Sequence, residues 1–266
     1  MQRYKYFPEI WGAIAILACL LMLEILISTA FYDAGVIFAY GDPRSMTVVV
    51  LANGIVFSTF MKITGIEYKD LFHPSSNSVS STLIVSVIPL AIIVISSLWW
   101  LGDIENYIAL LFPQDLASIN MLNRLLDGGF ITVIAICVIA PFVEEMLFRG
   151  IILRGFLIHY SPINAIVASS ALFGLIHLNI YQIPGAFVFG CIIGYIFYLS
   201  KSLWPCIFAH SLANALSYLL YIDNSEAYFL SKNVEFNSFI LNALTFCISV
   251  FGMYLFYRIF SVKNER

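Results

Sequence analysis

Apolar runs of about twenty residues, separated by short polar stretches, make up most of this 266-residue chain. A helix needs about 20 mainly apolar residues to cross a bilayer, and helices satisfy their own backbone polar groups there. The pattern therefore predicts an all-α, polytopic bundle of about eight transmembrane helices. The predicted spans are Ile10–Phe31, Met46–Ile63, Thr82–Leu101, Phe130–Ile158, Ile163–Ile180, Ile183–Leu199, Leu203–Tyr221 and Phe239–Phe260.

The composition agrees with this class, since 61% of the residues are hydrophobic and 11% are charged. A soluble domain is nearer half apolar and a quarter charged. No internal repeat is evident, so we expect a single integral-membrane domain over residues 1–266. The net charge is −3 without a basic stripe, and we expect membrane lipid rather than nucleic acid as a partner.

The cysteines indicate neither a disulfide framework nor a C-x-x-C metal motif, because all of them lie inside apolar runs and none forms such a pair. They are Cys19, Cys137, Cys191, Cys206 and Cys247.

Lysine and arginine in the connections predict the orientation, because these residues favour the cytoplasmic side. With both termini in the cytoplasm, nine of them fall on that side and three on the other. The nine are Arg3, Lys5, Lys62, Lys69, Arg154, Lys201, Arg258, Lys263 and Arg266, and the three are Arg44, Arg124 and Lys232.

The longest connection runs from Gly102 to Gly129 and contains a second kind of helix. Asp115 can cap a short amphipathic helix there. This helix is expected either on the membrane surface or against the end of the bundle.

Charged residues interrupt the fourth apolar run, which contains Glu144, Glu145 and Arg149. An ionisable residue at membrane depth indicates function unless it has a partner. Glu145 and Arg149 are four residues apart and are expected to pair on one helix face. Glu144 points about 100° away, which leaves its carboxylate without a local partner and available as a general base.

Three further polar groups follow in the next apolar runs. Phe173 and His177 share a face of the fifth helix at i, i+4, and His210 and Asn214 share a face of the seventh. A single histidine or asparagine on an apolar helix is commonly structural, and Phe173 is expected to pack. The combination of one free carboxylate, two histidines and an amide is what indicates a catalytic site in a core of about residues 129–221.

Depth along the helices decides whether these groups can meet. His177 lies 15 residues beyond Pro162, about 22 Å up its helix at 1.5 Å per residue. If the fourth helix continues to about Ile158, Glu144 lies about 21 Å above that end. We therefore expect one long fourth helix with Glu144 near His177. His210 starts only about 10 Å above Leu203, so helix tilt or a cavity must close that gap.

Two mechanisms are compatible with these groups. A glutamate and two histidines can hold Zn²⁺ with a bound water. Alternatively, Glu144 activates water directly with His177, while His210 and Asn214 stabilise an oxyanion. No H-E-x-x-H or G-x-S-x-G motif is present, so neither common signature helps to choose.

The region from Pro141 to Asn214 resembles the CPBP intramembrane proteases, which include the Ras-converting CAAX endopeptidases and bacterial Abi-type proteins. The motif E-E-x-x-x-R matches Glu144, Glu145 and Arg149; F-x-x-x-H matches Phe173 and His177; and H-x-x-x-N/D matches His210 and Asn214. The order of the three motifs and their placement in successive apolar helices agree with the family.

The resemblance implies that the chain is an intramembrane endopeptidase, of a family often called metalloproteases although its metal requirement is unsettled. Glu144 would activate water beside His177, with His210 and Asn214 on the oxyanion, and Glu145 and Arg149 would hold the helix. The substrate would be a lipidated CAAX-type protein or a membrane-associated precursor peptide, in a bacterial plasma membrane. The same resemblance leaves open a non-proteolytic bacteriocin-immunity or scaffold protein. A transporter is disfavoured by the missing repeat.

Overall fold

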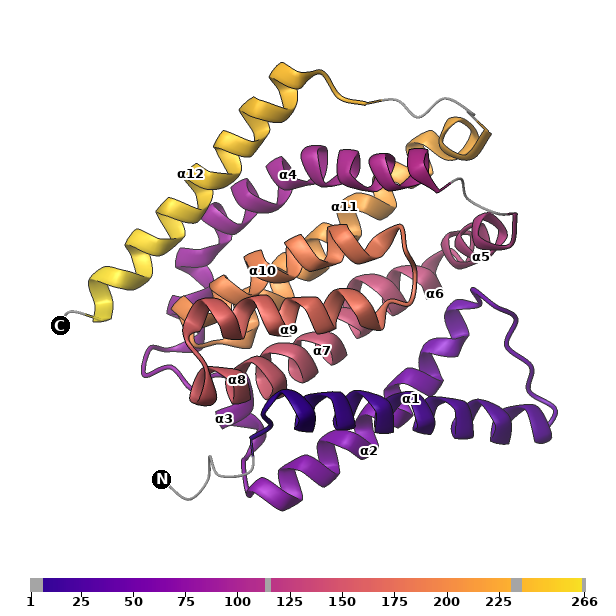
Figure 1. The fold of residues 1–266 in the computed structure, drawn as a ribbon, viewed down its shortest axis with the longest axis horizontal. Helices are drawn as coiled ribbons and strands as arrows, with labels where there is room; N and C mark the ends of the chain where they lie inside the picture. Colours follow the sequence, from indigo (N-terminus) through magenta and orange to yellow (C-terminus); the bar gives the residue numbers. More distant parts are fainter. Residues whose placement is uncertain (1–6, 113–115, 231–235, 265–266) are drawn as a thin grey trace.

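The computed structural model describes residues 7–112, 116–230 and 236–264 and is a bundle of helices without a strand in these ranges (Figure 1). The first half of the chain contains α1 (Ile10–Asp33), η2 (Pro43–Ser45), α2 (Met46–Thr64), α3 (Tyr68–Phe72), α4 (Val79–Leu111) and α5 (Leu116–Leu126). The second half contains α6 (Phe130–Thr132), η3 (Val133–Ile139), α7 (Ala140–Glu145), η4 (Met146–Leu153), α8 (Arg154–His159), α9 (Pro162–Ile176), α10 (Gln182–Ser200), α11 (Leu203–Leu230) and α12 (Phe239–Asn264).

All eight predicted spans are helical, and seven helices of the described ranges are long and apolar enough to cross a membrane. The protein is thus a multi-pass membrane protein. The exception is α9, which has 15 residues. The amphipathic helix is present as α5, but the expected cap Asp115 lies outside the described residues.

Local sequence signals start and stop several helices. Ser78 Oγ accepts the N–H of Ser81 and starts α4, while Ser161 with Pro162 at the first helical position starts α9. Gly65, with φ of 67°, ends α2 in the left-handed conformation that glycine adopts without steric cost. Leu178, two residues beyond the end of α9 at Ile176, has φ of 51°, a conformation uncommon for a residue with a side chain.

The segments α6, η3, α7, η4 and α8 form one uninterrupted helix from Phe130 to His159. The expectation of one long fourth helix is therefore confirmed. The sequence did not indicate its two π-helical segments, η3 and η4. π-helical turns are rare and often occur at functional sites.

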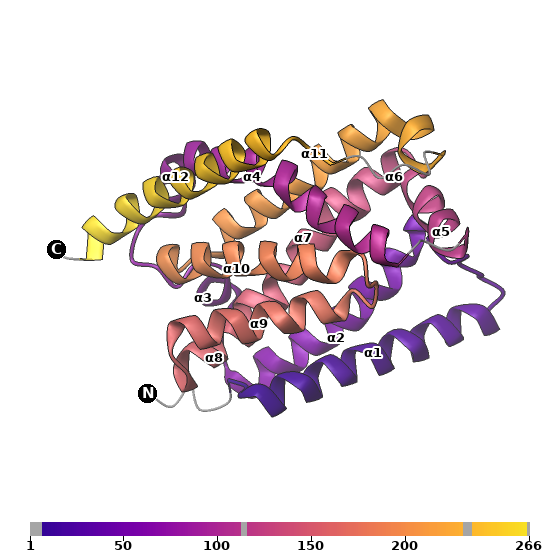
Figure 2. The ribbon, with the colours of Figure 1, turned by 45° about the horizontal axis from the view of Figure 1, so that its top comes forward.

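The long helix lies in the centre of the bundle, with α9, α10 and α11 against it and α1, α2, α4 and α12 outside (Figures 1 and 2). Its η4 segment is buried throughout. The start of α1, the short helix α3 and the end of α12 lie at the same end of the bundle, while α5 lies at the other (Figure 1). This arrangement has the two chain ends on one side; which side is cytoplasmic remains a prediction from the charges.

Close packing of α9 and α10 depends on glycines. A Cβ on Gly174 would lie 2.8 Å from the Ile183 carbonyl oxygen, and one on Gly190 would lie 3.1 Å from Ser170 Cβ. A Cβ on Gly194 would likewise lie 3.1 Å from Ile166 Cγ2, so the absence of a side chain at these glycines lets the two helices approach closely. All five cysteines are free thiols.

Candidate active site

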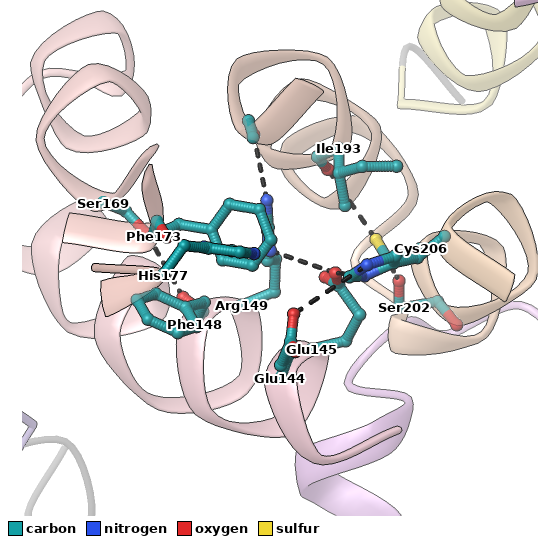
Figure 3. Close-up of polar contacts among 12 residues, drawn as sticks. Glu144, Glu145, Phe148, Arg149, Ser169, Phe173, His177, Ile193, Ser202 and Cys206 are labelled. Atoms are coloured by element: carbon teal, nitrogen blue, oxygen red, sulfur yellow. Dashed lines mark hydrogen bonds and ion pairs between the residues drawn. The ribbon is translucent and has the colours of Figure 1, made fainter. Parts of the chain in front are cut away.

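The buried part of the site is built around Glu145, whose side chain is 0% exposed. Its Oε1 accepts hydrogen bonds from Arg149 Nη1 at 3.0 Å and from His210 Nδ1 at 2.7 Å (Figure 3). The predicted Glu145–Arg149 ion pair is therefore confirmed. The contact with His210 was not foreseen, and it links the long helix to α11.

Arg149 is held on three sides. Besides Glu145, its Nη2 donates to the Gly190 carbonyl of α10 at 3.1 Å, and its guanidinium lies 4.6 Å from the centre of the Phe173 ring. A guanidinium can bind in this way because its planar fork offers several donors and a face that stacks on aromatic rings. Arg149 thus fastens α10 and α9 to the long helix.

Glu144 has a different environment, with its side chain 30% exposed. Its Oε2 lies 3.8 Å from His210 Nε2, and this oxygen is buried without a hydrogen-bond partner. His210 therefore lies between the two glutamates, with one ring nitrogen toward each. Because Nδ1 is committed to Glu145, Nε2 is the nitrogen that faces Glu144.

Packing fixes the His210 ring. Phe173 and Phe189 contact it edge to face, with centroids 5.9 and 5.6 Å away. One turn earlier on α11, Cys206 is fully buried and its thiol lies 3.5 Å from the Ser202 carbonyl oxygen. A ring held in this way keeps one fixed orientation, as precise catalytic geometry requires.

The depth gap expected for His210 closes because α11 starts level with the middle of the η4 segment, not with the end of the long helix at His159. Ser202 and Leu203, at its first turn, are both 0% exposed. A Cβ on Gly150 would lie 3.4 Å from Leu203 Cδ1, so the start of α11 is level with the middle of η4. From there, seven residues of helix bring His210 to the glutamates.

His177 lies at the end of α9, where its Nδ1 donates to the Phe173 carbonyl at 2.8 Å. Its ring contacts Phe173 edge to face at 5.0 Å. Among the described ion pairs, the carboxylate of Glu144 lies against His210, and none joins it to His177. The described contacts connect His177 to the cluster through Phe173, and its expected place near Glu144 stays a prediction.

Asn214 lies one turn beyond His210 on α11, and its Nδ2 donates to the Ile136 carbonyl in η3 at 2.7 Å. The structure therefore binds Asn214 to the long helix, eight residues before Glu144. The remaining predicted residues come from α7, η4, α9 with its C-cap, and α11; Glu144, Glu145, Arg149, Phe173 and His177 are labelled in Figure 3.

A cavity of about 510 Å³ lies beside α3, lined in part by Tyr68, Phe72 and Trp204. The rings of Phe72 and Trp204 both contact Phe142, at 6.3 and 5.9 Å. Phe142 precedes Glu144 by two residues, about 200° around the helix, so this aromatic cluster does not face the carboxylate. Beside the cavity, the cluster can contact apolar side chains.

The zinc alternative depends on the donor set. No group of three or more His, Cys, Asp or Glu side chains in the described ranges is arranged to hold a metal ion. Catalytic zinc uses three protein ligands and a water, and Glu144, His177 and His210 do not form such a group of three in the described ranges. The described donors do not fit a zinc ion, and we derive no step through one.

Sequence reasoning missed several residues of the polar network. The Gly190 and Ile136 carbonyls are backbone groups, which side-chain motifs do not reveal. Asp103 is 7% exposed and accepts hydrogen bonds from Asn237 and Asn242, which fastens α12 to α4. Asp103 falls in the stretch predicted as a connection, whereas α4 continues to Leu111.

Comparison with known proteins found one match. Residues 127–216 match the family model described as type II CAAX prenyl endopeptidase Rce1-like. No curated protein and no solved structure matches the chain. The matched region contains all of the predicted site residues and extends from the end of α5 to the middle of α11.

Proposed function

Residues 127–216 belong to the Rce1-like type II CAAX prenyl endopeptidase family, and from this premise we propose that the chain hydrolyses a peptide bond of a membrane-associated substrate with a water activated by Glu144. The observation that carries the proposal is the 3.8 Å separation of Glu144 Oε2 and His210 Nε2. A water hydrogen-bonded to both atoms would satisfy the unpaired carboxylate oxygen.

In the proposed reaction, the water oxygen attacks the carbonyl carbon of the scissile bond while Glu144 takes one of its protons. The C–N bond of the tetrahedral intermediate then breaks, and the same proton moves from Glu144 to the leaving nitrogen. Atoms and charge balance without a further reactant.

His210 has the second role. Its Nδ1–H is held by the buried Glu145 carboxylate, which offsets positive charge on the ring. When Nε2 carries a proton, it can donate to the developing oxyanion in a site shielded from bulk water. We assign His177, whose ring orientation is set by the Phe173 carbonyl, to the substrate side of Glu144.

The proposed substrates are a lipidated CAAX-type protein end or a membrane-associated precursor peptide. Both bring a scissile bond to a membrane-embedded carboxylate. The aromatic cluster of Phe72, Phe142 and Trp204 beside the α3 cavity is a surface that can contact apolar parts of such a substrate.

The test uses purified protein in lipid vesicles and three peptides: a prenylated CAAX-type peptide, the same peptide without the prenyl group, and a hydrophobic precursor peptide. We expect cleavage at a single bond, identified by mass spectrometry, that is absent with Glu144→Gln and unchanged by a chelator. Loss of cleavage with the chelator would overturn the metal-free route. Absence of cleavage with every peptide would favour the immunity or scaffold alternative.

A further inference from the structure

The long helix has a gap in its backbone hydrogen bonds at Pro141. In the π-helical segment η3, the N–H of Ala140 donates to the carbonyl of Ala135, five residues earlier. In that register the Ile136 carbonyl requires the N–H of residue 141. Residue 141 is proline, which has no N–H, so the helix itself offers this carbonyl no donor.

An unpaired carbonyl is costly at this position, because a hydrocarbon layer provides no water to hydrogen-bond with it. The Asn214 side chain fills the gap, with Nδ2 donating to the Ile136 carbonyl oxygen at 2.7 Å. Pro141 is buried and lies three residues before Glu144. The gap is therefore almost one helical turn from the carboxylates.

We propose that Asn214 is a positioning residue that replaces the N–H missing at Pro141 and so fixes the rotation of the helix that carries Glu144 and Glu145. A shift of one residue in helical register turns a side chain by about 100°, which would remove Glu144 from His210. α11 then holds the long helix at two levels: Asn214 binds η3 and His210 binds Glu145. The expected effect of Asn214 on catalysis rests on the proposed function. The hydrogen bond between Asn214 and the Ile136 carbonyl does not.

The competing role is the one implied by the family resemblance, in which Asn214 donates to the oxyanion. The two roles differ in what can replace the asparagine. A positioning residue is dispensable once the backbone regains its own donor at residue 141. A donor to the oxyanion is not.

The experiment is a double-mutant cycle of Asn214→Ala and Pro141→Ala in vesicles, with kcat, KM and Tm measured for each variant. We expect Asn214→Ala to lower kcat by about 10–100-fold, the order of loss produced by a small misplacement of catalytic groups, with KM little changed and Tm lowered. In the double variant the backbone N–H restored by Pro141→Ala donates to the Ile136 carbonyl. Its kcat should return to within about threefold of Pro141→Ala alone, and its Tm should recover.

Pro89, a buried proline inside α4, provides the matched control: Pro89→Ala should not rescue Asn214→Ala. A double variant that stays as slow as Asn214→Ala, with or without recovery of Tm, would overturn the positioning role. If Asn214→Ala does not fold, a folded and active double variant supports the proposal and an unfolded one contradicts it. If the native chain cleaves none of the peptides, the proposed function fails, while recovery of Tm in the cycle still decides whether Asn214 fills the gap.

Discussion

Glu144 and Glu145 are neighbours in the chain, yet they lie in two regions of opposite character. Glu145 belongs to a closed region with Arg149 and Phe173, where every side chain is at most 2% exposed and the charges are paired. Glu144 belongs to an open region, with its side chain 30% exposed and its Oε2 3.8 Å from His210 Nε2. The difference teaches that a turn of about 100° around the helix separates a carboxylate that holds the fold from one that is available for chemistry.

The largest expected effect tests the open region. Glu144→Gln keeps the volume of the side chain but removes its ability to take a proton from water. Removal of a general base typically lowers turnover by about 10²–10⁴-fold, and we expect at least that loss. Because Glu144 makes no hydrogen bond with its Oε2, Tm should stay within about a degree or two of the native value. A Glu144→Gln variant that retains turnover would remove the distinction between the two regions.

The closed region predicts the opposite response. Glu145→Gln leaves the Arg149 charge buried without its counter-charge, and breaking a buried pair in this way costs about 3–5 kcal/mol. We expect a clear fall in Tm measured in detergent. Adding Arg149→Met to the same chain removes the unpaired charge and should recover part of the lost stability. If Glu145→Gln is inactive yet as stable as the native protein while Glu144→Gln retains activity, the roles of the two glutamates are reversed.

Arg149→Lys gives a smaller effect within the closed region. An ammonium group keeps the charge, but it lacks the planar fork with which Arg149 reaches both Glu145 and the Gly190 carbonyl. Loss of one hydrogen bond from a charged donor costs about 1.5–3 kcal/mol. Tm should therefore fall less than for Glu145→Gln, and a fall as large would mean that geometry matters as much as charge here.

The smallest expected effect is a pH dependence far from the site. Arg44 donates to Asp42 and lowers the pKa of that carboxyl. A carboxyl whose pKa is lowered by folding stabilises the protein above its unfolded pKa, and this contribution is lost as the pH falls through the folded value. Between about pH 5 and pH 3, the native Tm should therefore drop slightly more than that of Asp42→Asn, as measured by thermal scans at each pH. Equal drops would show that the pair contributes nothing, as is common for exposed ion pairs.

The sequence predicted the helices and the Glu145–Arg149 pair of the site, because both depend on local patterns. Apolar runs located the spans, and the i, i+4 spacing of Glu145 and Arg149 located their pair. The depth argument correctly required one long helix but assumed that each helix starts at the membrane surface. α11 starts level with Gly150 in η4, which lets His210 reach Glu144.

The π-helical turns could not be derived from local propensity. Pro141 indicated that one hydrogen bond is missing, but not how the helix would adjust. The partner that completes the backbone is Asn214, 78 residues away from Ile136 in the chain. Only the packing of α11 against η3 brings them together.

The short helix α9 has a consequence for the lipids around it. Its 15 residues extend about 22 Å at 1.5 Å per residue, while the hydrocarbon layer of a bilayer is about 30 Å thick. A membrane adapts to a short apolar element by thinning beside it, which brings the aqueous phase nearer to the turn at His177 and Leu178. Each bond that is hydrolysed consumes one water, and a thinner layer shortens the path of that water. Acyl-chain length is therefore expected to act on turnover directly, so that the bilayer regulates the supply of one of the two reactants.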